Sequence, residues 1–116
     1  MPNYVALVDD TGNRYSRTNP IPTGGSAPVT YTNRSGTITT GGTAQVAMAA
    51  NATRRALYFQ NNSSGDMRVS STGTASSTSG VKIIAGALLT WFDAPPTTAL
   101  SVWGATTGQA WEAGEA

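Results

Sequence analysis

The stretch that most constrains the fold is residues 54–65, where a run of aromatic and aliphatic residues ends abruptly in small polar residues and a glycine. In an extended strand, Leu57 and Phe59 share one face, while Ala56 and Tyr58 share the other. Apolar residues on both faces indicate a strand in the interior of a sheet rather than at its edge. The polar residues that follow are typical of a tight turn. The rest of the chain is therefore expected to supply partners for this strand.

Short runs of the same kind recur along residues 37–116, at spacings near ten residues and with no convincing helix. After a first short strand at Ile38, we expect strands within residues 44–49, 67–70, 81–84, 87–92, 100–103 and 109–113. Val46 and Met48 have the same parity and are expected to share a face, although a helical turn over residues 47–52 is the alternative. The polar residues 71–80 predict a surface loop.

This pattern predicts an all-β fold, namely a small antiparallel β-sandwich of jelly-roll or immunoglobulin-like type, or a related barrel. We expect two parts: an extended N-terminal arm over residues 1–36, rich in proline and glycine, and a sandwich domain over residues 37–116. A short strand is expected at residues 4–8, followed by a turn. The alternative for the arm is a disordered tail.

If the arm orders against a neighbouring subunit, its aromatic, apolar and arginine side chains are the expected anchors, because such residues concentrate interface energy. The candidate partner-binding residues of the arm are Tyr4, Leu7, Arg14, Tyr15 and Ile21.

Charged residues make up only 11% of the chain, and the net charge is +1, against roughly 25% charged residues in an average soluble protein. Weak charge repulsion suggests that neighbouring molecules cover much of the surface, the alternative being a weakly charged soluble monomer. The charges form no basic stripe, so we expect no nucleic-acid partner. Arg54 and Arg55 are adjacent and should point to opposite faces. With no signal peptide and no spanning apolar run, we also expect no membrane association.

The chain has neither histidine nor cysteine, which removes the commonest general base and the commonest metal ligands. Asp66 and Asp93 are a conceivable carboxylate pair for glycoside hydrolysis, but both stand in turn contexts where aspartate bonds its own backbone. Residues 9–13 lack the alternating acids of a calcium loop. We therefore expect no enzyme, no metal site and no cofactor.

Trp91, Trp103 and Trp111, together with Tyr58, suggest a second kind of function, because exposed aromatic side chains on a β-sandwich stack on sugar rings. Trp103 has the parity opposite to Leu100 and is expected to face outward. The preferred alternative is that the indoles pack in the core or in a subunit interface. Trp103 and Trp111 are accordingly candidate partner-binding residues.

Two segments carry a resemblance to small virion proteins of tailed phages. One is residues 49–63, an alanine-asparagine opening followed by arginine, aliphatic residues and Gln60-Asn61-Asn62. The other is residues 100–109, which close with Gly104-Ala105-Thr106-Thr107-Gly108-Gln109. Residues 73–76, residues 84–86 and, more weakly, residues 9–22 add to it. From about residue 42 to the C-terminus, the chain thus resembles phage structural proteins.

The resemblance implies a capsid decoration (cement) protein that binds and stabilises the assembled shell, or else a head or tail fibre component. It implies a location on the capsid surface after synthesis in the host cytoplasm. The implied partners are the major capsid protein or another virion protein, and further copies of the chain, with a trimer favoured. We expect the arm to contact the shell and a sandwich face carrying the tryptophans to self-associate. The alternative is a carbohydrate-binding module that reads host glycans.

Overall fold

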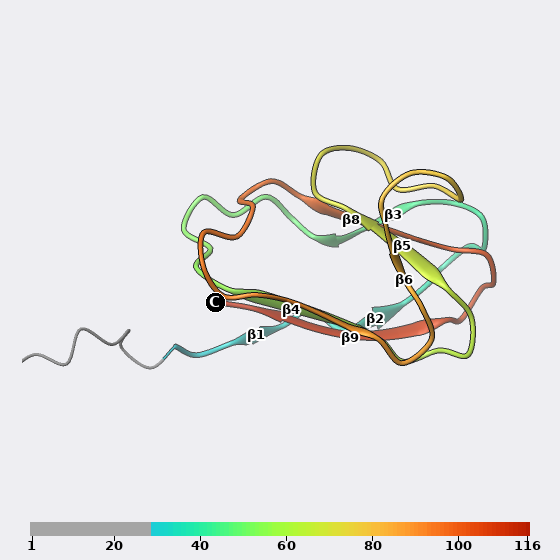
Figure 1. The fold of residues 1–116 in the computed structure, drawn as a ribbon, viewed down its shortest axis with the longest axis horizontal. Coiled ribbons are helices and arrows are strands. Elements are labelled where there is room, and N and C mark those ends of the chain that lie inside the picture. Colours follow the sequence, from blue (N-terminus) through green and yellow to red (C-terminus); the bar gives the residue numbers. More distant parts are fainter. Residues whose placement is uncertain (1–28) are drawn as a thin grey trace, which may run out of the picture.

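In a computed structural model, residues 29–116 are described and form two antiparallel sheets packed face to face (Figure 1). The predicted all-β sandwich is confirmed at this level, and the described residues contain no helix, so residues 47–52 do not form a helical turn. The predicted strand at residues 4–8 lies outside the described residues.

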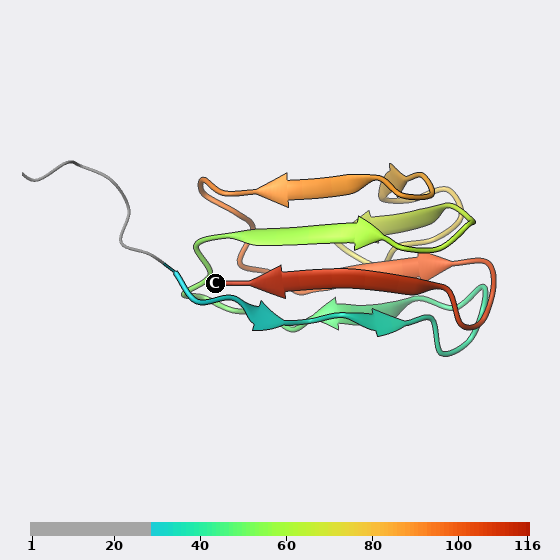
Figure 2. The same ribbon diagram turned by 90° about the horizontal axis from the view of Figure 1, so that it is seen from below.

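The first sheet has the strand order β1-β9-β4-β7, with β2 also pairing with β9. Its strands are β1 (Thr32–Asn33), β2 (Gly36–Thr37), β4 (Leu57–Asn61), β7 (Leu88–Trp91) and β9 (Ala110–Glu115). The two short strands β1 and β2 follow one another along the same edge of β9 (Figure 2). The sheet therefore begins at Thr32, inside the range expected as an arm.

The second sheet has the order β3-β8-β5-β6, formed by β3 (Gln45–Met48), β5 (Met67–Ser70), β6 (Val81–Ile83) and β8 (Leu100–Gly104). Across both sheets the antiparallel pairings are nested: β1 and β2 pair with β9, β3 with β8, β4 with β7, and β5 with β6. The chain thus runs out to the loop of residues 71–80 and returns along itself. That loop contains no strand, as predicted.

β4 is the interior strand that its sequence predicts, because it pairs with β9 on one side and β7 on the other. Leu57 and Phe59 are fully buried and face the second sheet, where Met67, Val69, Leu100 and Val102 complete the core. Phe59 also stacks on Trp111 of β9, with the ring centroids 6.0 Å apart. Burial of this apolar surface is the main stabilising term of the fold.

The expectation that Val46 and Met48 share a face is wrong. The β3–β8 register shifts between these two residues, as a β-bulge does. Because the bulge inserts an extra residue, Met48 enters the core while Val46 remains exposed on the outer surface. A single irregularity in pairing therefore reverses the parity on which the expectation depended.

Candidate interaction surface

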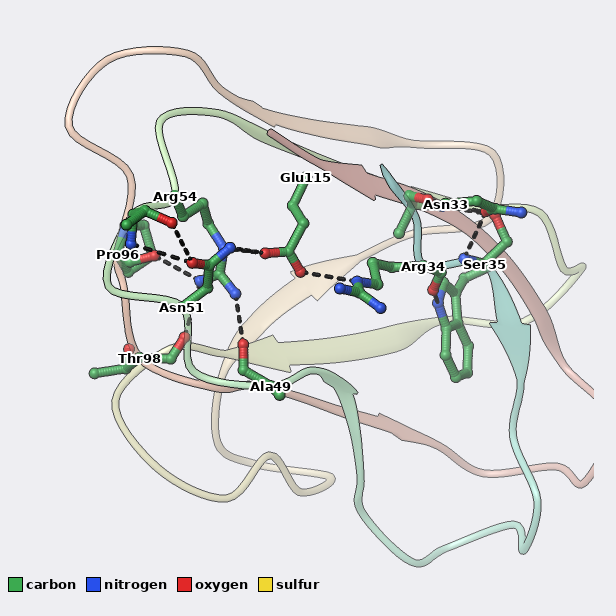
Figure 3. A network of polar contacts seen from close by, with 12 residues as sticks. Asn33, Arg34, Ser35, Ala49, Asn51, Arg54, Pro96, Thr98 and Glu115 are labelled. Atoms are coloured by element: carbon green, nitrogen blue, oxygen red, sulfur yellow. Dashed lines mark hydrogen bonds and ion pairs between the residues drawn. The ribbon is translucent and has the colours of Figure 1, made fainter. Parts of the chain in front are cut away.

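One end of the sandwich is closed by a buried polar cluster centred on Arg54 and Glu115 (Figure 3). Glu115 lies on the same face of β9 as Trp111 and Ala113, which face the core, so its carboxylate enters the interior. An ionised carboxylate there requires charged or hydrogen-bonding partners. Arg54, just before β4, supplies one: its Nε lies 3.4 Å from Glu115 Oε1.

The remaining guanidinium N–H groups of Arg54 hold two loops at the same point. Nη1 donates to the carbonyls of Pro96 at 2.6 Å and Thr98 at 2.9 Å, and Nη2 donates to the carbonyl of Ala49 at 2.8 Å. The loop between β3 and β4 and the loop between β7 and β8 are thus tied to the end of β9 (Figure 3). Arg55, its neighbour, is exposed, as the predicted opposite orientation requires.

Glu115 accepts further bonds from Asn51 Nδ2 at 2.6 Å and from Arg34 Nε at 3.0 Å. Burial raises the pKa of Glu115, but the hydrogen bonds from Asn51 and Arg34 and the charge of Arg54 outweigh it and lower the pKa below the usual 4.5. The cluster is saturated by internal bonds, and within residues 29–116 no buried side-chain nitrogen or oxygen lacks a partner. Its role in this structure is to hold the fold.

The partner-binding residues predicted from the sequence fall in different places. Tyr4, Leu7, Arg14, Tyr15 and Ile21 lie outside the described residues.

The structure places Trp111 in the core at 5% exposure, where its indole N–H donates to the carbonyl of Arg34 at 2.9 Å. Trp111 therefore has no surface to offer a partner, which corrects its assignment as a contact residue. The burial agrees with the alternative that the indole packs in the core. Residue parity did not reveal this, because Trp111 shares its face of β9 with the small Ala113 and the charged Glu115.

Trp103 is half-buried on the outer face of the second sheet, opposite Arg68 of β5. It lines a shallow hollow of about 190 Å³ together with Arg68, Lys82, Asp66, Ser77 and Met67. Lys82 and Asp66 form an exposed ion pair at 3.3 Å. The predicted outward orientation of Trp103 thus places an indole beside charged and hydroxyl groups.

A larger apolar hollow, of about 230 Å³, lies where the two sheets end at β6 and β7. Val81 of β6 and Leu89 and Trp91 of β7 line its sides, and Val69 and Leu100 of the core reach it from beneath. Sequence reasoning did not single out this hollow. The available signal was in residues 87–92, whose apolar residues occupy both parities, although in a sandwich of two sheets only one face of each strand meets the core.

We define the apolar edge as the exposed large apolar residues of segment 81–92, which carries the edge strands β6 and β7: Val81, Ile84, Leu88, Trp91 and Phe92. Of these, Val81 and Trp91 line the hollow. These are five of the seven exposed large hydrophobic residues in the described part of the chain. Scattered apolar residues need no explanation on a protein surface, but a concentration of them marks an interaction site. The apolar edge is therefore the candidate interaction surface.

Within residues 29–116, no group of three or more acidic side chains is placed to hold a metal ion. No helix in that range has the length and apolar character to cross a membrane. No protein-family model matches the chain, and no curated protein or solved structure shows significant similarity to it.

Proposed function

We propose that the chain is a virion structural protein of a tailed phage, specifically a capsid decoration protein that binds the assembled shell. Its resemblance to phage structural proteins motivates the assignment to a virion. The structural observation that carries an assembly role is the apolar edge on a domain with few charges. A surface of this kind is suited to contact with other protein copies rather than to chemistry.

The segments that carry the resemblance hold structural positions. Residues 49–63 include Arg54, which ties two loops to β9, and the interior strand β4. Residues 100–109 form β8 and the turn that leads to β9, where buried Gln109 donates to the Ser63 hydroxyl at 3.0 Å and to the carbonyl of Asp66 at 3.3 Å. The shared pattern therefore describes a scaffold, and this supports a structural role rather than a catalytic one.

The proposal includes a jelly-roll topology. The nested pairings of β1 and β2 with β9, β3 with β8, β4 with β7 and β5 with β6 are what a long antiparallel hairpin gives when it is rolled into two sheets. Jelly rolls occur in viral capsid proteins and also in lectins. The topology thus supports a virion role by analogy with fold, not by a shared site.

Shell stabilisation follows from differential binding. A protein that binds the assembled shell but not its free subunits shifts the equilibrium toward the shell, and repeated sites on one particle increase the occupancy. We propose that the segment preceding β1 makes the shell contacts, with the major capsid protein as partner. We also propose that the protein is a homo-oligomer, with a trimer favoured. An oligomer presents several copies of this segment to the shell at once.

The test uses purified full-length protein and empty shells of the phage that encodes it. We expect saturable cosedimentation with shells at a fixed ratio to the capsid subunit, a higher melting temperature of the coated shell, and no binding to free capsid subunits. A variant that lacks residues 1–28, and so keeps every described strand, should lose shell binding while retaining the circular dichroism of the folded domain. Equal binding to shells and to free subunits would contradict the proposal.

The hollow at Trp103 favours a second candidate function, recognition of host glycans. An indole bordered by Arg68, Lys82, Asp66 and a serine hydroxyl offers both a stacking surface and hydrogen-bonding groups for a sugar. A glycan array separates the two functions: a sugar reader binds defined glycans and loses them in Trp103→Ala, whereas a decoration protein binds none and coats shells equally well with that change.

A further inference from the structure

The feature that the proposed shell contacts leave unused is the apolar edge. Its five residues, Val81, Ile84, Leu88, Trp91 and Phe92, are between 38% and 64% exposed. An aromatic side chain buries 150–250 Å², and with about 150 Å² for each aliphatic one the five residues together expose roughly 500 Å² of apolar surface. That is more than half of the ~800 Å² that each partner contributes to a standard stable interface.

The backbone at this edge is also unpaired. β7 pairs only with β4, and β6 pairs only with β5, so within the described residues each strand has one side without a neighbouring strand. Proteins that must remain monomeric protect such edges with charges, prolines or bulges. Over residues 81–92 the only charged side chain is Lys82, and no proline interrupts either strand.

The edge contains both a hollow and a side chain of a size to fill it. The hollow lined by Val81, Leu89 and Trp91 measures about 230 Å³, and an apolar cavity of about 150 Å³ is enough to hold a benzene ring. Phe92 directly follows Trp91 and is 64% exposed, the largest exposed fraction among the large apolar residues described. Each copy thus presents both an exposed phenyl group, one residue after Trp91, and an apolar hollow.

We infer that the apolar edge is a contact between two copies of this chain, in which Phe92 of one copy enters the hollow of the other. The shortage of charge on the edge favours an identical partner, because two copies meet there without opposing like charges, and Lys82 is already paired with Asp66. The contact rests on the same apolar edge as the assembly role proposed above, but it does not require shell binding: a decoration protein and a glycan reader can both associate in this way.

The experiment measures the molar mass of the full-length protein by sedimentation at several concentrations. We expect a dimer, or a ring of three if the contact runs head to tail, and either mass satisfies the inference over a single chain of 11.9 kDa. Phe92→Asp and Val81→Asp should each weaken association about thirtyfold or more, as loss of a hot-spot side chain does. Both residues are exposed, so the variants should keep the fold.

Val46→Asp is the matched control, because Val46 is an equally exposed apolar residue that lies on β3, at the other edge of the second sheet. Its mass should equal that of the unchanged protein. Leu7→Asp tests the other possible occupant, the segment preceding β1, and should also leave the mass unchanged. A monomer at every concentration, or dissociation by Val46→Asp or Leu7→Asp but not by Phe92→Asp, would overturn the inference.

Discussion

At the scale of single residues, Arg54 is the side chain with the most consequences. It is 4% exposed and bonds to Glu115 and to three backbone carbonyls of two loops. Removal of the guanidinium takes the positive charge away from the buried Glu115 carboxylate. It also takes a hydrogen-bond donor away from three backbone carbonyls. Losing one partner of a buried pair costs more than the net value of the pair, because the remaining charge stays in the interior.

We therefore expect Arg54→Met to lower the free energy of unfolding by about 3–5 kcal/mol. The adjacent Arg55→Met is the matched control and should change it by less than about 0.5 kcal/mol, because Arg55 is exposed. Urea titrations followed by tryptophan fluorescence measure both values. Similar losses in the two variants would show that the Arg54 bonds contribute nothing specific.

The ionisation of Glu115 gives a prediction on pH. Its pKa in the folded protein is lowered below the usual 4.5, so the folded state binds the carboxylate's proton less readily than the unfolded state does. The stability that Glu115 contributes is therefore complete above about pH 4.5 and is lost as the pH falls through the lower folded-state pKa.

Urea titrations at a series of pH values from neutral to acid test this dependence. The unchanged protein should lose stability more steeply below about pH 4.5 than Glu115→Gln, which has no proton to take up at this position. At neutral pH the variant should be the less stable of the two, since its amide cannot pair with Arg54 and Arg34 as a charge. Parallel pH profiles for the two proteins would contradict the assignment.

At the scale of elements, the turn after β4 depends on Asn61. Asn61 is fully buried; its Nδ2 donates to the carbonyls of Gly65 at 2.7 Å and Ile83 at 2.8 Å, and its Oδ1 accepts from the backbone N–H of Ser63 at 2.9 Å. One side chain thus closes the β4–β5 turn and joins it to the end of β6 in the other sheet.

We expect Asn61→Ala to lower the free energy of unfolding by about 2–4 kcal/mol, because it leaves buried backbone groups without partners. Asn62→Ala changes the same residue type at the next, exposed position and should cost less than about 0.5 kcal/mol. Thermal and urea unfolding measure the difference. Equal costs would show that the turn closes without the amide of Asn61.

The strands themselves were largely predictable from the sequence, because short alternating apolar runs bounded by polar turns have few other solutions. β4 is the clearest case: Leu57 and Phe59 on one face and Tyr58 on the other indicated an interior strand, and β7 and β9 flank it. The bulge in β3 was not predictable, since nothing in the local sequence distinguishes a bulged Val46–Met48 segment from a regular one.

At the scale of the whole molecule, the nested topology sets the folding rate. β1 pairs with β9, with Thr32 opposite Glu115. The sequence separation of this pair is close to the largest that residues 29–116 allow. Such pairings require long loops to close before any contact compensates their entropy, so folding is slow. We expect refolding on the scale of milliseconds to seconds in stopped-flow fluorescence. Refolding in microseconds would indicate that local contacts dominate.

The sequence by itself determined the class of fold, the interior position of β4 and the outward orientation of Trp103, because these follow from residue parity and turn composition over a few neighbouring positions. Only the tertiary structure decided that Trp111 is buried, that Arg54 and Glu115 meet, and that apolar residues collect at the β6 and β7 edge. Those outcomes depend on which strands become neighbours. Strand order joins residues sixty or more positions apart, as Arg54 and Glu115 show, and local pattern carries no information about such pairs.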